Sequence, residues 1–138
     1  MRWFAILLIA AWMLFGGAAH MIVPQAFYPI VPDWMPELWV VWISGLVELA
    51  IGIGVLIPRT RGVSGLVFAG LCLCFLPLHV WDFFRPDPVF PVPWGAGARI
   101  IVQLGLIALG LWLWRRESQP AGAAAESGDT RRTDSNSA

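Results

Sequence analysis

Four long runs of apolar residues follow one another along the chain, separated by short segments rich in proline or arginine. They cover residues 3–23, 38–57, 62–84 and 95–114. A helix needs about 20 apolar residues to cross the hydrocarbon core of a bilayer, and each run is close to that length. The pattern therefore predicts an all-α fold, a membrane four-helix bundle formed by residues 1–116.

The segment after the fourth run has a different character. Residues 117–138 contain no large apolar side chain, so we expect a disordered cytoplasmic tail. Of the 138 residues, 58% are hydrophobic and 13% are charged, whereas soluble globular chains are about a quarter charged. The net charge is zero, so no basic surface for nucleic acid is expected.

Arginine is distributed unevenly between the two ends of the expected bundle. One end has only Arg85 in its loops. The other end has five arginines: Arg2, Arg59, Arg61, Arg115 and Arg116. Positive residues in short loops mark the cytoplasmic side of a membrane. We therefore expect both termini in the cytoplasm and both proline-rich loops outside, in a multi-pass protein of the bacterial cytoplasmic (inner) membrane.

The first run also shares features with a secretory signal peptide. It has a basic start, an apolar middle and small residues at Gly17 and Ala19. Cleavage after Ala19 would leave three spans and make His20 the new N-terminus. Because the apolar run continues through Val23, we favour an uncleaved first span and keep cleavage as an alternative.

Polar residues are few inside the expected spans. We single out seven of them: His20, Ser44, Glu48, His79, Asp82, Arg99 and Gln103. At about 1.5 Å rise per residue, Glu48 lies roughly 15 Å below the outer end of its span and Gln103 about 12 Å. A charge facing lipid would cost at least about 2.5 kcal/mol. We therefore predict an outward-facing polar pocket inside the membrane, with Arg99 and Gln103 as the nearest partners of Glu48.

The pocket residues do not identify a reaction. Glu48 could have a structural role, as a hydrogen-bonded carboxyl that fixes the register of the helices. It could also have a functional role, in which it holds a proton or binds a polar group of a ligand. His20 and His79 could ligate a metal or haem, but a hydrogen-bonded core histidine is more common, and we predict no metal site. Cys72 and Cys74 are two apart on a helix, point to different faces and should be dispensable. No catalytic residue is identified, which argues against an enzyme that acts alone.

The second run carries the most specific motif. S-G-x-x-E-x-x-x-G-x-G-x-L-x-P-x-x-R matches the segment from Ser44 to Arg61. A G-x-x-H pair, formed by Gly17 and His20, and a proline-rich loop precede it, and Arg99 and Gln103 open the last span. With these motifs the chain resembles the DoxX family of small four-span bacterial membrane proteins up to Trp114. The third span departs from the family pattern, because relatives often have Phe-Pro-Ala-Asn where this chain has Leu76-Pro77-Leu78-His79.

The resemblance implies a redox-associated membrane subunit. Members are similar to a subunit of thiosulfate:quinone oxidoreductase and to partners of thiol-oxidative-stress systems, and a related branch assists maturation of a redox enzyme. We expect a non-catalytic subunit or adapter of a quinone- or thiol-linked membrane redox system. A small-molecule or quinone carrier and a membrane assembly factor remain alternatives. No cofactor is evident from the motifs, a quinone is the candidate, and the expected partners are lipid, a redox-enzyme subunit or a second copy of the chain.

Overall fold

Five helices make up the regular secondary structure of residues 1–119, the part of the chain that this computed structural model describes. They are α1 (Arg2–Ile22), the short 3-10 helix η1 (Pro24–Ile30), α2 (Glu37–Leu56), α3 (Arg61–Phe84) and α4 (Trp94–Ser118). The four α-helices are long and apolar enough to cross a membrane. The prediction of an all-helical fold with four candidate spans is therefore confirmed for these residues.

The helices end close to where the apolar runs end, except in α4. That helix continues past Trp114 to Ser118, so Glu117 and Ser118 are helical, although we assigned them to the disordered tail. An ion pair accounts for the extension, because Oε1 of Glu117 lies 2.8 Å from Nε of Arg2. The rest of the predicted tail, residues 120–138, lies outside the described residues.

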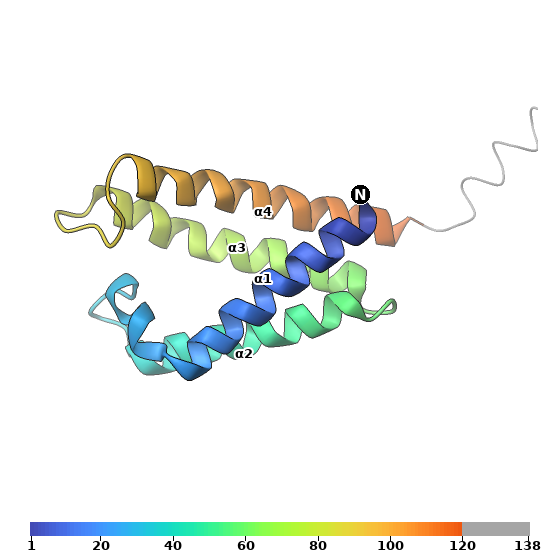
Figure 1. The fold of residues 1–138 in the computed structure, drawn as a ribbon, viewed down its shortest axis with the longest axis horizontal. Coiled ribbons are helices and arrows are strands. Elements are labelled where there is room, and N and C mark those ends of the chain that lie inside the picture. Colours follow the sequence, from blue (N-terminus) through green and yellow to red (C-terminus); the bar gives the residue numbers. More distant parts are fainter. Residues whose placement is uncertain (120–138) are drawn as a thin grey trace, which may run out of the picture.

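The four long helices associate as two pairs, α1 with α2 and α3 with α4 (Figure 1). Glycines allow the close approach in each pair. A Cβ atom added to Gly17 would lie 2.7 Å from the carbonyl oxygen of Gly45, and one added to Gly110 would lie 2.7 Å from that of Gly65. Such contacts let helix backbones approach closely where lipid supplies no hydrophobic drive. Contacts between the pairs, α2 with α3 and α1 with α4, are sparser.

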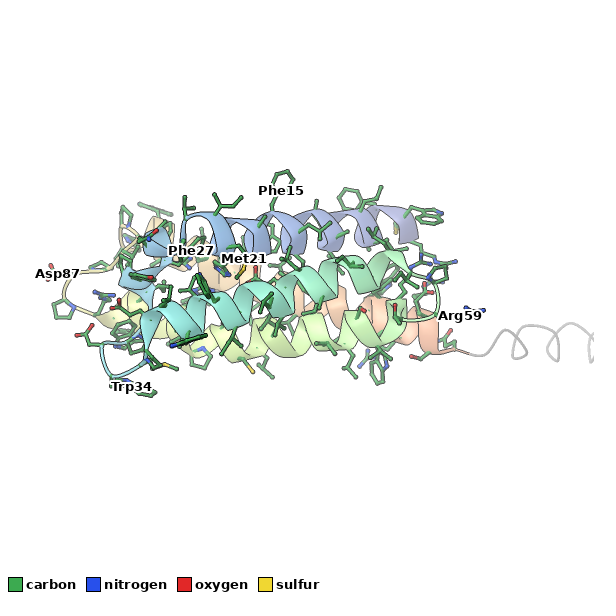
Figure 2. All side chains as sticks on the ribbon, turned by 90° about the horizontal axis from the view of Figure 1, so that it is seen from below. Phe15, Met21, Phe27, Trp34, Arg59 and Asp87 are labelled. Atoms are coloured by element: carbon green, nitrogen blue, oxygen red, sulfur yellow. The ribbon has the colours of Figure 1, made fainter. Side chains whose placement is uncertain are left out.

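The two ends of the molecule differ. Figure 1 shows the N-terminus, the α2–α3 turn and the end of α4 together at one end, which we call the turn end. The loops 24–36 and 85–93 lie at the opposite, loop end, and Figure 2 shows Trp34 and Asp87 there and Arg59 at the turn end. The five arginines predicted to share a side are thus in segments at the turn end.

The apolar core lies toward the turn end. Its most buried side chains come from the first turns of α1 and α3 and the last turns of α2 and α4: Ile6, Ile9, Val55, Phe68 and Leu113. Large apolar side chains also cover the outside of the helices, including Phe4, Phe15, Ile53, Val63 and Ile101. An apolar exterior on every long helix is the surface expected of a protein surrounded by lipid.

A buried arginine closes the turn end. Arg61 is only 2% exposed, and its guanidinium donates hydrogen bonds to the carbonyl oxygens of Val55 (3.0 Å) and Leu56 (3.1 Å). These are among the last carbonyls of α2, which have no partner within that helix. Arg61 also lies over the Trp3 ring, 5.3 Å from its centroid, and 3.9 Å from Glu117. The side chain therefore links the starts of α1 and α3 to the ends of α2 and α4.

Candidate functional site

The seven polar residues fall into two clusters, one on each helix pair. The first cluster lies on α1 and α2 and consists of His20, Ser44 and Glu48. The second lies on α3 and α4 and comprises His79, Asp82, Arg99 and Gln103. No hydrogen bond or ion pair joins the two clusters within residues 1–119. Each cluster is therefore held by the helix pair that carries it.

The first cluster is organised around Nδ1 of His20. This atom lies 3.3 Å from Oγ of Ser44 and 3.5 Å from Oε1 of Glu48. Ser44 donates its single hydroxyl proton to the carbonyl oxygen of Val41 at 2.9 Å, so its Oγ can only accept from the imidazole. The contacts thus assign the proton of a neutral His20 ring to Nδ1 and leave Nε2 as a hydrogen-bond acceptor.

Small residues on α1 and α2 make room for this cluster. A Cβ atom on Gly16 would lie 2.5 Å from Oε2 of Glu48, and one on Gly45 would lie 2.7 Å from Cβ of His20. Phe27 of η1 covers the imidazole edge to face, with ring centroids 4.0 Å apart. Glu48 is 4% exposed, and among the described residues His20 is the one charged or titratable side chain within ion-pair distance of it.

The second cluster is organised around Asp82, which is 1% exposed. Its Oδ1 accepts a hydrogen bond from the backbone N–H of Val89 at 2.9 Å, and its Oδ2 lies 3.7 Å from Nη1 of Arg99. Arg85 lies 3.9 Å from the same carboxylate and donates to the carbonyl oxygen of Pro29 at 2.7 Å. Asp82 therefore anchors the loop after α3 as well as Arg99.

The predicted partners of Glu48 are wrong. Arg99 pairs with Asp82, and Nε2 of Gln103 donates a hydrogen bond of 2.6 Å to the carbonyl oxygen of Cys72. The physical reason is that α3 and α4 pack closely along their length, whereas Glu48 belongs to the other pair. The positions along the helices could have indicated the correct pair. Arg99 and Asp82 both lie near the loop-end termini of their helices, whereas Glu48 lies near the middle of α2.

A cavity of about 930 Å³ lies between the two helix pairs. It is lined by six of the seven predicted residues: His20, Ser44, Glu48, His79, Arg99 and Gln103. Asp82 does not line it and acts behind Arg99. Most of the remaining wall is apolar and includes Trp12, Phe15, Phe27, Phe75 and Phe90. Such a wall is complementary in character to a molecule with a small polar part and a larger apolar part.

Two polar atoms of the cavity residues are buried without a hydrogen-bond partner in the described chain. They are Nδ1 of His79 and Nη1 of Arg99, the latter with only its ion pair to Asp82. Buried polar groups in folded proteins are nearly always bonded, so unpaired ones beside a cavity mark where a bound molecule could contribute. The second cluster therefore offers a guanidinium donor, and the first offers the Glu48 carboxyl and Nε2 of His20 as acceptors.

Metal binding and cysteine chemistry are the other possibilities that the sequence raises. Within residues 1–119 no group of three or more His, Cys, Asp or Glu side chains is arranged to hold a metal ion. Cys72 is buried and Cys74 exposed, and both are free thiols, consistent with their pointing to different faces of α3. Sequence reasoning missed the buried role of Arg61, whose signal is its position just after the unpaired carboxyl end of α2.

A known protein family matches most of the chain. A family model described as "Domain of unknown function (DUF8561)" matches residues 9–115. The match covers most of the 138-residue chain and contains both polar clusters, while Arg2 and Glu117 lie outside it. No curated protein and no solved structure matches the chain.

Proposed function

The chain belongs to the family described as a domain of unknown function, DUF8561, and from that premise we propose a function built on its cavity. We propose that it is a multi-pass protein of the bacterial cytoplasmic membrane, with both termini in the cytoplasm. Its role is that of a non-catalytic subunit in a membrane redox system. In that role the cavity binds a lipid-soluble small molecule of the quinone class.

The observation that carries this proposal is the composition of the cavity wall. A volume of about 930 Å³ is large enough for a ring and part of a tail, and the wall is mostly apolar. The polar side chains are confined to two clusters on different helix pairs. In the reduced, quinol form the ring has hydroxyl groups on opposite sides, so one hydroxyl could donate to the acceptors near Glu48 while the oxygen of the other accepts from Arg99.

Three sequence features support the wider setting. The S-G-x-x-E motif around Glu48 supports a DoxX-like role, and through that resemblance a redox system as partner. The arginines at the turn end support a cytoplasmic location for it. The apolar helix surfaces support insertion into lipid. An adapter that binds only protein, and an assembly factor that holds a client at the loop end, are the competing roles.

Purification in mild detergent distinguishes these roles. Membranes containing the tagged chain should yield a complex in which mass spectrometry of the organic extract finds a quinone near one equivalent per chain. The Glu48→Gln variant should lose that quinone, whereas Glu37→Gln, on the same helix but away from the cavity, should retain it. A co-purified redox enzyme without quinone would support the adapter, and a quinone retained by Glu48→Gln would contradict the proposed site.

A further inference from the structure

Between α1 and α4, the described residues leave the cavity open on one side. Trp12 and Phe15 of α1 and Val102 of α4 line the cavity, yet they are 49%, 80% and 45% exposed. Figure 2 shows Phe15 pointing away from the bundle. The contacts between α1 and α4 are sparse compared with those inside either pair. Side chains that belong both to the cavity wall and to the lipid-facing surface mark an opening between them.

The loop end of the cavity is covered instead. Phe27 of η1 and Phe90 of the loop 85–93 both line it there. The hydrogen bond from Arg85 to the carbonyl oxygen of Pro29 joins these two segments across the gap between the helix pairs. The bond from the N–H of Val89 to Asp82 holds the second loop onto α3. A molecule approaching from the aqueous side therefore meets two linked loops with aromatic side chains beneath them.

Along α1, the residues that line the cavity change from polar or small near the loop end to large and apolar toward the turn end. His20 and Gly16 lie beside Glu48 in the half nearer the loop end, and Trp12 and Leu8 continue the same face toward the turn end. From His20 to Leu8 this face extends about 18 Å along the helix axis. A polar ring held by the two clusters would thus have an apolar channel leading from it to the opening.

We infer that the ligand reaches the cavity sideways from the lipid, through the opening between α1 and α4, and that its single hydrocarbon tail lies against Trp12, Phe15 and Val102. This inference rests on the proposed function and adds a tail site and a route to it. Binding through lipid suits the apolar surroundings of the opening, since neither ring nor tail has to cross the linked loops. The polar clusters then select the ring, and the channel selects the tail.

Photolabelling of the tail locates it directly. The probe is a benzoquinone whose decyl tail ends in a diazirine. It and its competitor are kept in the reduced, quinol form and added to the full chain in lipid nanodiscs, and the adducts are mapped by mass spectrometry. Adducts on α1 at Trp12 or Phe15 and on α4 at Val102, competed by decyl-benzoquinone, are expected. Adducts confined to residues 24–36 and 85–93 would overturn the lateral route and leave the ring site standing. Absence of any competed adduct would overturn both the route and the proposed function.

A pair of variants on α4 provides the second measurement. Val102→Trp fills the opening, while Leu104→Trp places the same bulk two residues away on an exposed face that does not line the cavity. Val102→Trp should weaken binding of reduced decyl-benzoquinone about tenfold and leave binding of reduced methyl-benzoquinone unchanged. Leu104→Trp should change neither. Equal weakening of both quinones by Val102→Trp, or none of either, would contradict a tail site at the opening.

Discussion

Nη1 of Arg99 lies 3.7 Å from Oδ2 of Asp82, so the one arginine that lines the cavity is paired within its own helix pair. Asp82 is almost completely buried and is positioned in turn by the N–H of Val89. The guanidinium is thereby held with one face over Phe90, 4.1 Å from the ring centroid. The orientation of the Arg99 guanidinium is thus fixed by Asp82 and Phe90, and its charge is balanced without Glu48.

This pairing predicts a specific pattern of coupling. Asp82→Asn and Arg99→Gln should each destabilise the protein, and the double variant should be less destabilised than their sum, with a coupling of about 1 kcal/mol or more. Glu48→Gln combined with Arg99→Gln should be additive within about 0.5 kcal/mol. Unfolding in detergent measures both cycles. A larger coupling for Glu48 than for Asp82 would show that the ion pair is assigned to the wrong carboxylate.

Gly16 makes room for the Glu48 carboxyl, and the space can be tested. Gly16→Ala should leave the protein about 1 kcal/mol less stable than the same change at Gly105, because its Cβ would lie 2.5 Å from Oε2 and the end of the Glu48 side chain must shift. Adding Glu48→Ala should restore most of that loss. Gly105→Ala is the matched control, since nothing lies within 4 Å of its added Cβ, and it should be neutral or stabilising by about 1 kcal/mol. The midpoint of thermal unfolding measures the stability of each variant. Equal changes for Gly16→Ala and Gly105→Ala would contradict the contact between Gly16 and the Glu48 carboxyl.

Arg61 should matter for stability and not for ligand binding. Arg61→Gln removes charged hydrogen bonds to the last carbonyls of α2, at a cost of about 1.5–3 kcal/mol. Arg59→Gln, exposed in the same turn, should cost less than about 0.5 kcal/mol. The midpoint of thermal unfolding in detergent measures both. A similar midpoint for the two variants would mean that Arg61 does not hold the turn end together.

The first helix should remain attached to the mature protein. Ile6, Ile9 and Met13 of α1 are buried in the core, so removal of residues 1–19 would expose the packed faces of the other helices. Intact mass of the purified chain should therefore include these residues, and a reporter at Ser118 should be active only inside the cell. Loss of residues 1–19, or a C-terminal reporter active only outside, would contradict the proposed topology.

The helices could be predicted from the sequence because run length alone sets the number of spans. The polar residues could be identified because few charged or amide side chains occur in apolar runs, and six of the seven line one cavity. Their partners could not be predicted, because pairing depends on which helices pack most closely. Which helices pack most closely depends on glycine contacts such as that between Gly17 and Gly45. The positions of these glycines in the sequence do not show that they contact each other.

The opening between α1 and α4 could not be predicted from the sequence either. Apolar residues such as Phe15 and Val102 look alike whether they face lipid, a neighbouring helix or a cavity. At the loop end, Phe27 and Phe90 line the cavity, and nothing in their sequence spacing indicates that they meet there. Loop conformation depends on contacts such as that between Arg85 and Pro29, which join segments far apart in the chain.

Titration of decyl-benzoquinone, kept in its reduced, quinol form, into the purified chain tests the central claim most directly. Glu48→Gln replaces one carboxyl oxygen of the first cluster with an amide N–H donor, and His79→Leu removes the buried, unpaired nitrogen of the second cluster without breaking a hydrogen bond in the described chain. Each variant should weaken binding about tenfold, and Glu37→Gln should bind like the unaltered protein. Unchanged affinity in Glu48→Gln and His79→Leu, with both variants folded and monodisperse, would contradict a quinone site between the two polar clusters.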